Sequence, residues 1–286
     1  MNVAPTAAKP DGRLDGGIRG VGRRVATVVQ EHRLATFFVI AIALSWSYWI
    51  PDALLGGTWS HYPGLVGPAI AAVIVARVAE DRAGRAAFRR SITRWRVPLR
   101  WYAAALIPIA AAALVIVVQA VTGNAPSFSD LGAVDGVPGA TWLGVFAFLL
   151  LVDGFGEEIG WRAYAWPRLR EQHSLFGASV LLAVPWTIWH LPLFFVDSGM
   201  RGSSIAFVPM FYVSLVAGSV VLGWLFERSH AVIVVALWHT MLNMGTATRG
   251  TATAAPLVVM AVMLFAIAIL RHETRTSARA MAGRTR

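Results

Sequence analysis

The chain has 286 residues, of which 57% are hydrophobic and 14% are charged. An average soluble domain is about 45–50% apolar and about 25% charged, so this composition excludes an ordinary soluble enzyme. The chain contains no cysteine, which excludes disulfides, thiolate nucleophiles and cysteine-ligated metal centres. Its formal net charge of +10 indicates a negatively charged partner, either nucleic acid or the surface of a membrane.

Apolar runs that are candidates for membrane-spanning helices follow one another along the chain. A spanning helix needs about 20 mostly apolar residues, with a range of about 17–25. The runs cover residues 34–50, 63–76, 101–121, 139–152, 174–196, 202–226, 231–248 and 251–270. The sequence therefore predicts an all-α, polytopic transmembrane bundle of about eight spans. The boundary of the fourth run is the least defined, because its apolar stretch can continue into the polar segment that follows.

The basic residues are distributed unevenly between the two sides of this bundle. If both termini are cytoplasmic, all but two of the 25 Lys and Arg residues fall inside, the exceptions being Arg201 and Arg249. Positively charged loops stay in the cytoplasm, so the positive charge indicates topology. A nucleic-acid partner is not expected, because no DNA- or RNA-binding motif accompanies the charge. The expected partner of the basic surface is the lipid bilayer.

The same pattern predicts the division of the chain. Residues 1–33 are expected to form a basic, disordered cytoplasmic tail, residues 34–270 the transmembrane helical domain, and residues 271–286 a second basic cytoplasmic tail. Nearly all of the basic residues are Arg, and Ala is frequent, which is typical of a GC-rich bacterial genome. We therefore expect a multi-pass protein of a bacterial plasma membrane.

The first motif with ionisable residues follows the fourth apolar run and reads Glu157-Glu158-Ile-Gly-Trp161-Arg162. Ionisable residues in or beside spans are costly and by default mark function. Glu158 and Arg162 are four residues apart, in the favourable order for a helical ion pair, so Arg162 is expected to hold Glu158 ionised. Glu157 has no such partner and is left free to act as a general base. The alternative is an ordinary ion pair in a helix at the membrane surface.

The other two motifs place histidines in apolar helices. His190 lies in the fifth run, close to Trp186 and Trp189, whereas His239 and Asn243 share one face of the seventh. The second pair is suited either to bind a metal ion or to donate hydrogen bonds to a developing oxyanion. The alternatives are a hydrogen-bonded core histidine at position 190 and a polar pair that joins neighbouring helices.

In this order, the three motifs resemble those of the CPBP family of intramembrane proteases. The family includes the Rce1-type CAAX prenyl endopeptidases and bacterial relatives linked to bacteriocin processing or immunity. Its pattern is Glu-Glu-x-x-x-Arg, then Phe-x-x-x-His, then His-x-x-x-Asn or Asp. The first and third motifs match fully, and the second matches at His190 but has Trp186 where the family has Phe. The resemblance covers about residues 139–248, and an aromatic wall is kept at position 186.

The resemblance implies hydrolysis of a peptide bond in a membrane-associated protein or peptide, at a site that opens toward the cytoplasm. Glu157 would activate the water molecule, with His190 as its partner. His239 and Asn243 would stabilise the tetrahedral oxyanion, and the remaining two motif residues would form the structural pair inferred above.

The family has also been described as metal-dependent. The resemblance then implies a Zn²⁺ ion held by Glu157, His190 and His239, with the fourth position left for water. The residues alone do not choose between a glutamate protease and a metalloprotease, so both mechanisms stay open.

Two other kinds of function also stay open. A non-catalytic membrane protein of the same fold would bind a toxin or a partner protein, as in bacteriocin immunity, although the complete set of motif residues favours an enzyme. A proton-coupled transporter would also use intramembrane Glu and His. The sequence contains no pair of broken half-helices of the kind found in inverted-repeat transporters.

Overall fold

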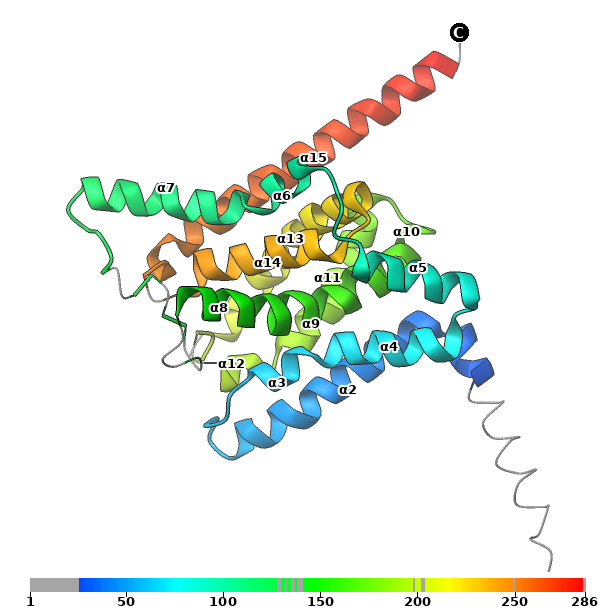
Figure 1. Ribbon diagram of the computed structural model, residues 1–286, viewed down its shortest axis with the longest axis horizontal. Helices are drawn as coiled ribbons and strands as arrows, with labels where there is room; N and C mark the ends of the chain where they lie inside the picture. Colours follow the sequence, from blue (N-terminus) through cyan, green and yellow to red (C-terminus); the bar gives the residue numbers. More distant parts are fainter. Residues whose placement is uncertain are drawn as a thin grey trace, which may run out of the picture.

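The computed structural model describes residues 26–284, apart from 128–129, 132, 135–136, 138–140, 198, 202–203 and 249. All regular secondary structure in these described ranges is helical, which confirms the all-α prediction. Figure 1 shows the helices packed side by side, with α14 in the middle of the bundle. Residues 1–25 of the predicted N-terminal tail lie outside the described residues, as does Arg249.

Within the described part of the chain, five helical segments are long and apolar enough to cross a membrane. They are α2 (Arg33–Leu54), α3 (Tyr62–Leu65) with α4 (Gly67–Ala79), α11 (Leu175–His190) with α12 (Leu193–Val196), α13 (Val208–Ser229) and the first part of α15 (Ala255–Arg284). A sixth candidate is the pair α6 (Leu99–Ala105) and α7 (Ile107–Val121), bent by 46°. The protein is therefore an integral membrane protein.

The sequence predicted about eight spans, whereas the described residues contain five or six candidates. The difference arises because two of the apolar runs do not form long, regular α-helices. Helix α14 (Val232–Thr246) has 15 residues and is a shorter apolar helix. The fourth run is helical but not a regular α-helix. The number of spans and the cytoplasmic position of both termini therefore stay predictions.

The fourth run continues into the polar segment as one helical stretch of alternating geometry. Helix α8 (Trp142–Leu149) leads into a π-helical segment, η1 (Leu150–Gly154), and the stretch continues through α9, η2 and α10. Of these last three segments, α9 covers Phe155–Glu158, the π-helical η2 covers Ile159–Ala165, and α10 covers Trp166–Arg170. A π-helical turn has an i→i+5 hydrogen bond and is frequent at functional sites. The two glutamates of the first motif thus lie between two widened turns, and the rest of the motif lies in the second one.

Glycines let this stretch approach its neighbours closely. A Cβ atom on Gly154 would lie 2.8 Å from the carbonyl oxygen of Ala236 in α14, and one on Gly160 would lie 2.6 Å from Cβ of Pro68 in α4. Any larger residue would push these backbones apart. Small residues at helix contacts are typical of membrane proteins, because packing there relies on close van der Waals contact.

A cluster of buried indole rings fixes α2 against the motif helices. The ring of Trp189 in α11 lies 4.9 Å from that of Trp49 in α2 and 5.8 Å from that of Trp161 in η2, measured between ring centroids. The Trp189 indole N–H donates a hydrogen bond of 2.7 Å to Ser45 Oγ, which in turn donates to the carbonyl of Gly64. The polar atoms in this cluster thus have partners, as burial in an apolar bundle requires.

Charged residues from three predicted cytoplasmic segments meet at one end of the bundle. The carboxylate of Glu80, at the end of α4, lies 2.6 Å from Arg168 in α10 and 3.5 Å from Arg33 at the start of α2. The neighbouring helix α5 (Arg82–Thr93) lies, like Glu80, between the second and third apolar runs and has no buried residue. This gathering is consistent with one cytoplasmic face for the three segments.

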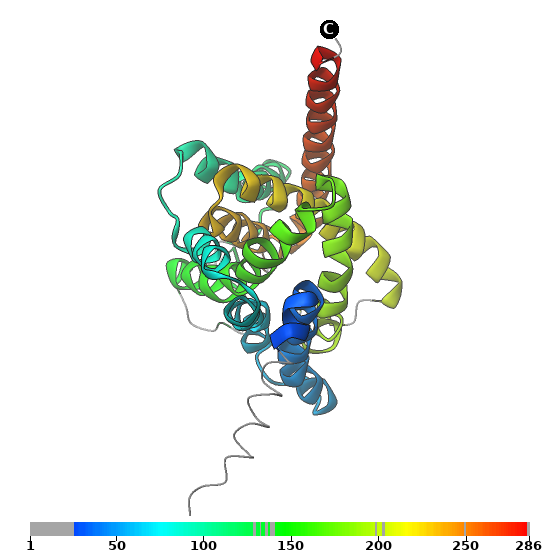
Figure 2. The ribbon, with the colours of Figure 1, turned by 90° about the vertical axis from the view of Figure 1, so that its right-hand side faces the viewer.

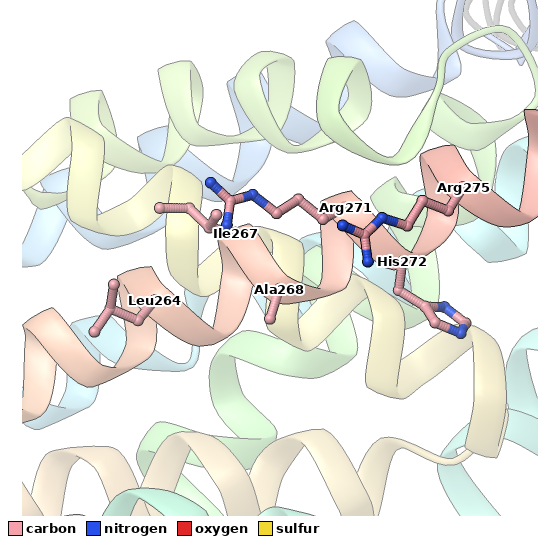
Figure 3. Close-up of a pocket in the computed structure, with 6 residues that line it drawn as sticks. All are labelled: Leu264, Ile267, Ala268, Arg271, His272 and Arg275. Carbon is pink, nitrogen blue, oxygen red and sulfur yellow. The ribbon is translucent and has the colours of Figure 1, made fainter.

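The C-terminal part of α15 projects beyond the other helices, as Figure 2 shows. The predicted tail 271–286 is helical as far as Arg284. Figure 3 shows side chains of this helix that line a pocket, among them the long side chains of Arg271 and Arg275. Exposed arginines that follow an apolar stretch are typical of a helix leaving the membrane.

The absence of cysteine makes the predicted topology directly testable. A cysteine introduced at Ala87, exposed in α5, should react with a membrane-impermeant maleimide only from the cytoplasmic side. A cysteine at Ser204, exposed before α13, should react only from the opposite side. Labelling of inside-out and right-side-out vesicles measures both. The unsubstituted chain is the control and should stay unlabelled, whereas labelling of both variants from one side would overturn the topology.

Candidate active site

Three charged side chains of the first motif are buried in the apolar bundle. Glu157 is 2% exposed, and Glu158 and Arg162 are fully buried. Taking a charge out of water costs several kcal/mol unless the charge is paired and hydrogen-bonded. The partners of these groups therefore determine what the site can do.

Glu158 pairs with residues of two helices. One of its carboxylate oxygens lies 3.3 Å from Arg162 Nε, four residues along the same helical stretch. The other lies 2.8 Å from Nδ1 of His239 in α14. The ion pair expected from the spacing of Glu158 and Arg162 is thus present. The contact to His239 was not expected from sequence, and it directs the other ring nitrogen, Nε2, away from Glu158.

Glu157 is oriented by tryptophan rather than by a cation. Its Oε2 atom accepts hydrogen bonds from the indole N–H of Trp186 in α11, at 2.8 Å, and of Trp161 in η2, at 3.1 Å. The described residues supply no ion pair to this carboxylate. The prediction that Glu157 lacks a basic partner along its helix agrees with this arrangement.

Asp153 belongs to the site, although the sequence argument passed over it. The side chain is 4% exposed, and its Oδ2 atom accepts a hydrogen bond from the amide Nδ2 of Asn243. Asp153, Glu157 and His239 each offer one ligand atom, and these three atoms lie within 4.8 Å of one another. The signal that could have found it is the spacing, because Asp153 precedes Glu157 by four residues at the end of an apolar run.

His190 lies beside this group and is not part of it. It is the last residue of α11, and its Nδ1 atom is 2.7 Å from the carbonyl oxygen of Trp186. A carbonyl oxygen only accepts, so Nδ1 carries the hydrogen and Nε2 of the neutral ring is an acceptor. The ring packs edge-on against Trp189 and Phe211, at centroid distances of 4.7 and 5.1 Å.

The donor set of Asp153, Glu157 and His239 fits a divalent ion such as Zn²⁺, which binds carboxylate oxygen and imidazole nitrogen. Metal-bound histidines usually donate their other N–H to a carboxylate, and Glu158 accepts such a bond from His239. The ligand set expected from the family was Glu157, His190 and His239. The structure brings two of these three together, with Asp153 and not His190 as the third member.

Comparison with known proteins finds a family model that matches the region of this site. Residues 138–245 match the family model of type II CAAX prenyl endopeptidase Rce1-like proteins. This matched region, residues 138–245, is called the Rce1-like domain below. The resemblance inferred from the three motifs is thereby confirmed, and all six predicted site residues lie within the Rce1-like domain.

A second comparison gives one named relative. A segment of 102 residues is 33% identical to CAAX prenyl protease 2 of Methanococcus maripaludis. The segment covers 34% of this chain and 38% of the relative. The similarity thus spans about a third of this chain, and more than half of the relative's length lies outside it.

The Rce1-like domain departs from the family pattern at Trp186, and the structure gives this departure a consequence. The sequence suggested only that position 186 keeps an aromatic side chain. The indole N–H of Trp186 also donates a hydrogen bond to Glu157, which a phenylalanine ring cannot do.

Removal of Arg162 should destabilise the Rce1-like domain strongly. In the Arg162→Ala variant the buried Glu158 loses its cation, and breaking a buried pair in this way costs about 3–5 kcal/mol. Chemical unfolding of the purified protein in detergent measures the change. The control is Arg89→Ala in α5, an exposed residue, whose loss should change the free energy of unfolding by less than about 0.5 kcal/mol. Equal effects of the two substitutions would contradict the structural role of the buried pair.

Proposed function

We propose that the protein is an intramembrane endopeptidase that hydrolyses a peptide bond of a membrane-associated protein or peptide. The observation that carries the proposal is the buried carboxylate of Glu157, which two indole N–H groups orient beside His239 and Asp153. The match to the Rce1-like family and the name of the relative, CAAX prenyl protease 2, support it.

In the proposed reaction Glu157 accepts a proton from a water molecule, whose oxygen attacks the carbonyl carbon of the scissile bond. The tetrahedral intermediate then collapses, the C–N bond breaks, and Glu157 returns the proton to the leaving amine. His190 assists the first step, because its neutral ring keeps Nε2 as a hydrogen-bond acceptor for the water.

The developing oxyanion is stabilised by His239 and Asn243. Glu158 accepts the hydrogen bond from Nδ1 of His239, so a protonated ring is favoured and Nε2–H is free to donate. Asn243 donates one amide hydrogen to Asp153 and keeps the second for the oxyanion. Asp153 therefore holds the amide in a fixed orientation.

A bound divalent ion is the alternative way to activate the substrate. Asp153, Glu157 and His239 would hold it, and the ion would act as a Lewis acid that polarises the scissile carbonyl. The fit of this donor set supports Asp153 in place of His190 as the third ligand. His190 would then remain an acceptor beside the ion.

The substrate class follows from the family and the expected membrane. A protein or peptide with a prenylated C-terminal CAAX sequence is one candidate, because the relative is named a CAAX prenyl protease. A bacterial membrane protein or peptide without a prenyl group is the other, and the sequence composition favours it. In both cases we propose that the scissile bond enters the site from the cytoplasmic side of the plasma membrane.

Substitution of Glu157 tests the reaction. The Glu157→Gln variant keeps the size of the side chain but cannot accept the proton, so the rate of cleavage should fall by about 10²–10⁴-fold. The assay uses proteoliposomes and two quenched fluorescent peptides that differ only in a C-terminal farnesyl group. The control is Glu171→Gln, a half-exposed surface acid, which should keep full activity. Full activity of Glu157→Gln, or no cleavage of either peptide by the unsubstituted protein, would count against the proposal.

Metal analysis separates the two mechanisms. If an ion is held by Asp153, Glu157 and His239, the purified protein should contain about one Zn²⁺ per chain, as structural and catalytic zinc sites do. Asp153→Asn should then lose it and His190→Gln should retain it. Full activity in a metal-free sample after chelation would leave Glu157 alone as the group that activates water.

A further inference from the structure

We propose that Trp186 is a positioning residue that, together with Trp161, orients the Glu157 carboxylate through its indole N–H group. Both indoles donate to the same atom, Oε2 of Glu157, at 2.8 and 3.1 Å. This holds the carboxylate plane and turns the other oxygen, Oε1, toward the reacting water. The inference rests on the proposed function, because it concerns how the proposed base is aimed.

The two donors come from different helical segments and donate to the same carboxylate oxygen. Trp161 lies four residues after Glu157 on the same helical stretch, and Trp186 lies on α11. One donor alone leaves a carboxylate free to rotate about the hydrogen bond, whereas two donors from separate elements restrict it. All three residues are at most 3% exposed, so bulk water does not compete for these hydrogen bonds.

The Trp186 ring is itself held by a different contact. The guanidinium carbon of Arg162 lies 4.4 Å from its ring centroid, over the ring face. The face of the indole thus meets a cation while its N–H edge meets Glu157. Because Arg162 pairs with Glu158, the structural ion pair of the first motif also supports the orientation of the neighbouring Glu157.

Packing alone does not account for a tryptophan at this position. The family pattern has Phe here, which would provide an aromatic ring for packing but has no N–H group that could donate a hydrogen bond. Hydrogen bonds to charged groups are stronger than those between neutral groups, so the additional donor is expected to matter for the rate. The Trp186→Phe substitution removes the N–H and retains an aromatic ring.

The chain provides a matched control in Trp166 of α10. This residue is 1% exposed, and its indole N–H also donates to a carboxylate, Oε1 of Glu227, at 3.0 Å. Trp166→Phe therefore removes the same kind of hydrogen bond from a buried tryptophan outside the site.

The first measurement compares kcat and KM of these two variants in proteoliposomes, with whichever of the farnesylated and unmodified peptides the unsubstituted protein cleaves. Trp186→Phe should lower kcat about 10–100-fold and leave KM within about twofold, because the donor orients the base and does not bind the peptide. Trp166→Phe should leave both constants within about twofold. A fall in kcat no larger for Trp186→Phe than for Trp166→Phe would overturn the inference.

The second measurement does not depend on activity. A double-mutant cycle between Trp186→Phe and Glu157→Ala, read from the unfolding midpoint in detergent, reports whether the two side chains interact. Trp186→Phe should lower the midpoint of the unsubstituted protein and have a smaller effect when Glu157 is absent. Additive effects would overturn the contact. A protein that cleaves neither peptide but shows the coupling would overturn the proposed function and leave the contact established.

Discussion

Glu158 is the residue on which the arrangement of the site depends, because its carboxylate is fully buried and can be tolerated there only with partners. One partner, Arg162, comes from its own helical stretch, and the other, His239, comes from α14. The pairing therefore joins the first and third motifs, which are about 80 residues apart in sequence. It also engages the only cation of the first motif in an ion pair, and the neighbouring carboxylate of Glu157 accepts its hydrogen bonds from indole N–H groups.

The local helix geometry serves this arrangement. The two glutamates of the motif lie between two π-helical segments, η1 and η2, and each widened turn rotates the following side chains relative to a regular α-helix. Small residues allow the stretch to lie close to α4 and α14, with Gly154 against the backbone of α14. The polar side chains of the site thus contact one another inside the bundle, between helices whose outer surfaces are apolar.

The sequence predicted the all-helical architecture and the pairing of Glu158 with Arg162, since both follow from hydropathy and from a spacing of four. It did not predict the Asp153–Asn243 hydrogen bond or the contact between His239 and Glu158, because these depend on how α14 packs against the motif helix. The sequence did not predict the π-helical turns either, because an argument from 3.6 residues per turn assumes a regular α-helix. The hydrogen bond from Trp186 was missed because its aromatic ring was considered only for its shape.

The charges of the site lead to one requirement that both proposed mechanisms share. Asp153, Glu157 and Glu158 are buried carboxylates, and in the part of the chain that the structure describes one guanidinium pairs with them, that of Arg162 with Glu158. If all three are ionised and His239 is neutral, two negative charges are left without compensation in a medium of low dielectric constant, which is unfavourable. Protonation of His239 and of one carboxylate would compensate these two negative charges. A divalent ion held by Asp153, Glu157 and His239 would do the same. The glutamate and metal mechanisms are therefore two ways to balance the same charge, and each needs Glu158 to hold His239 in place.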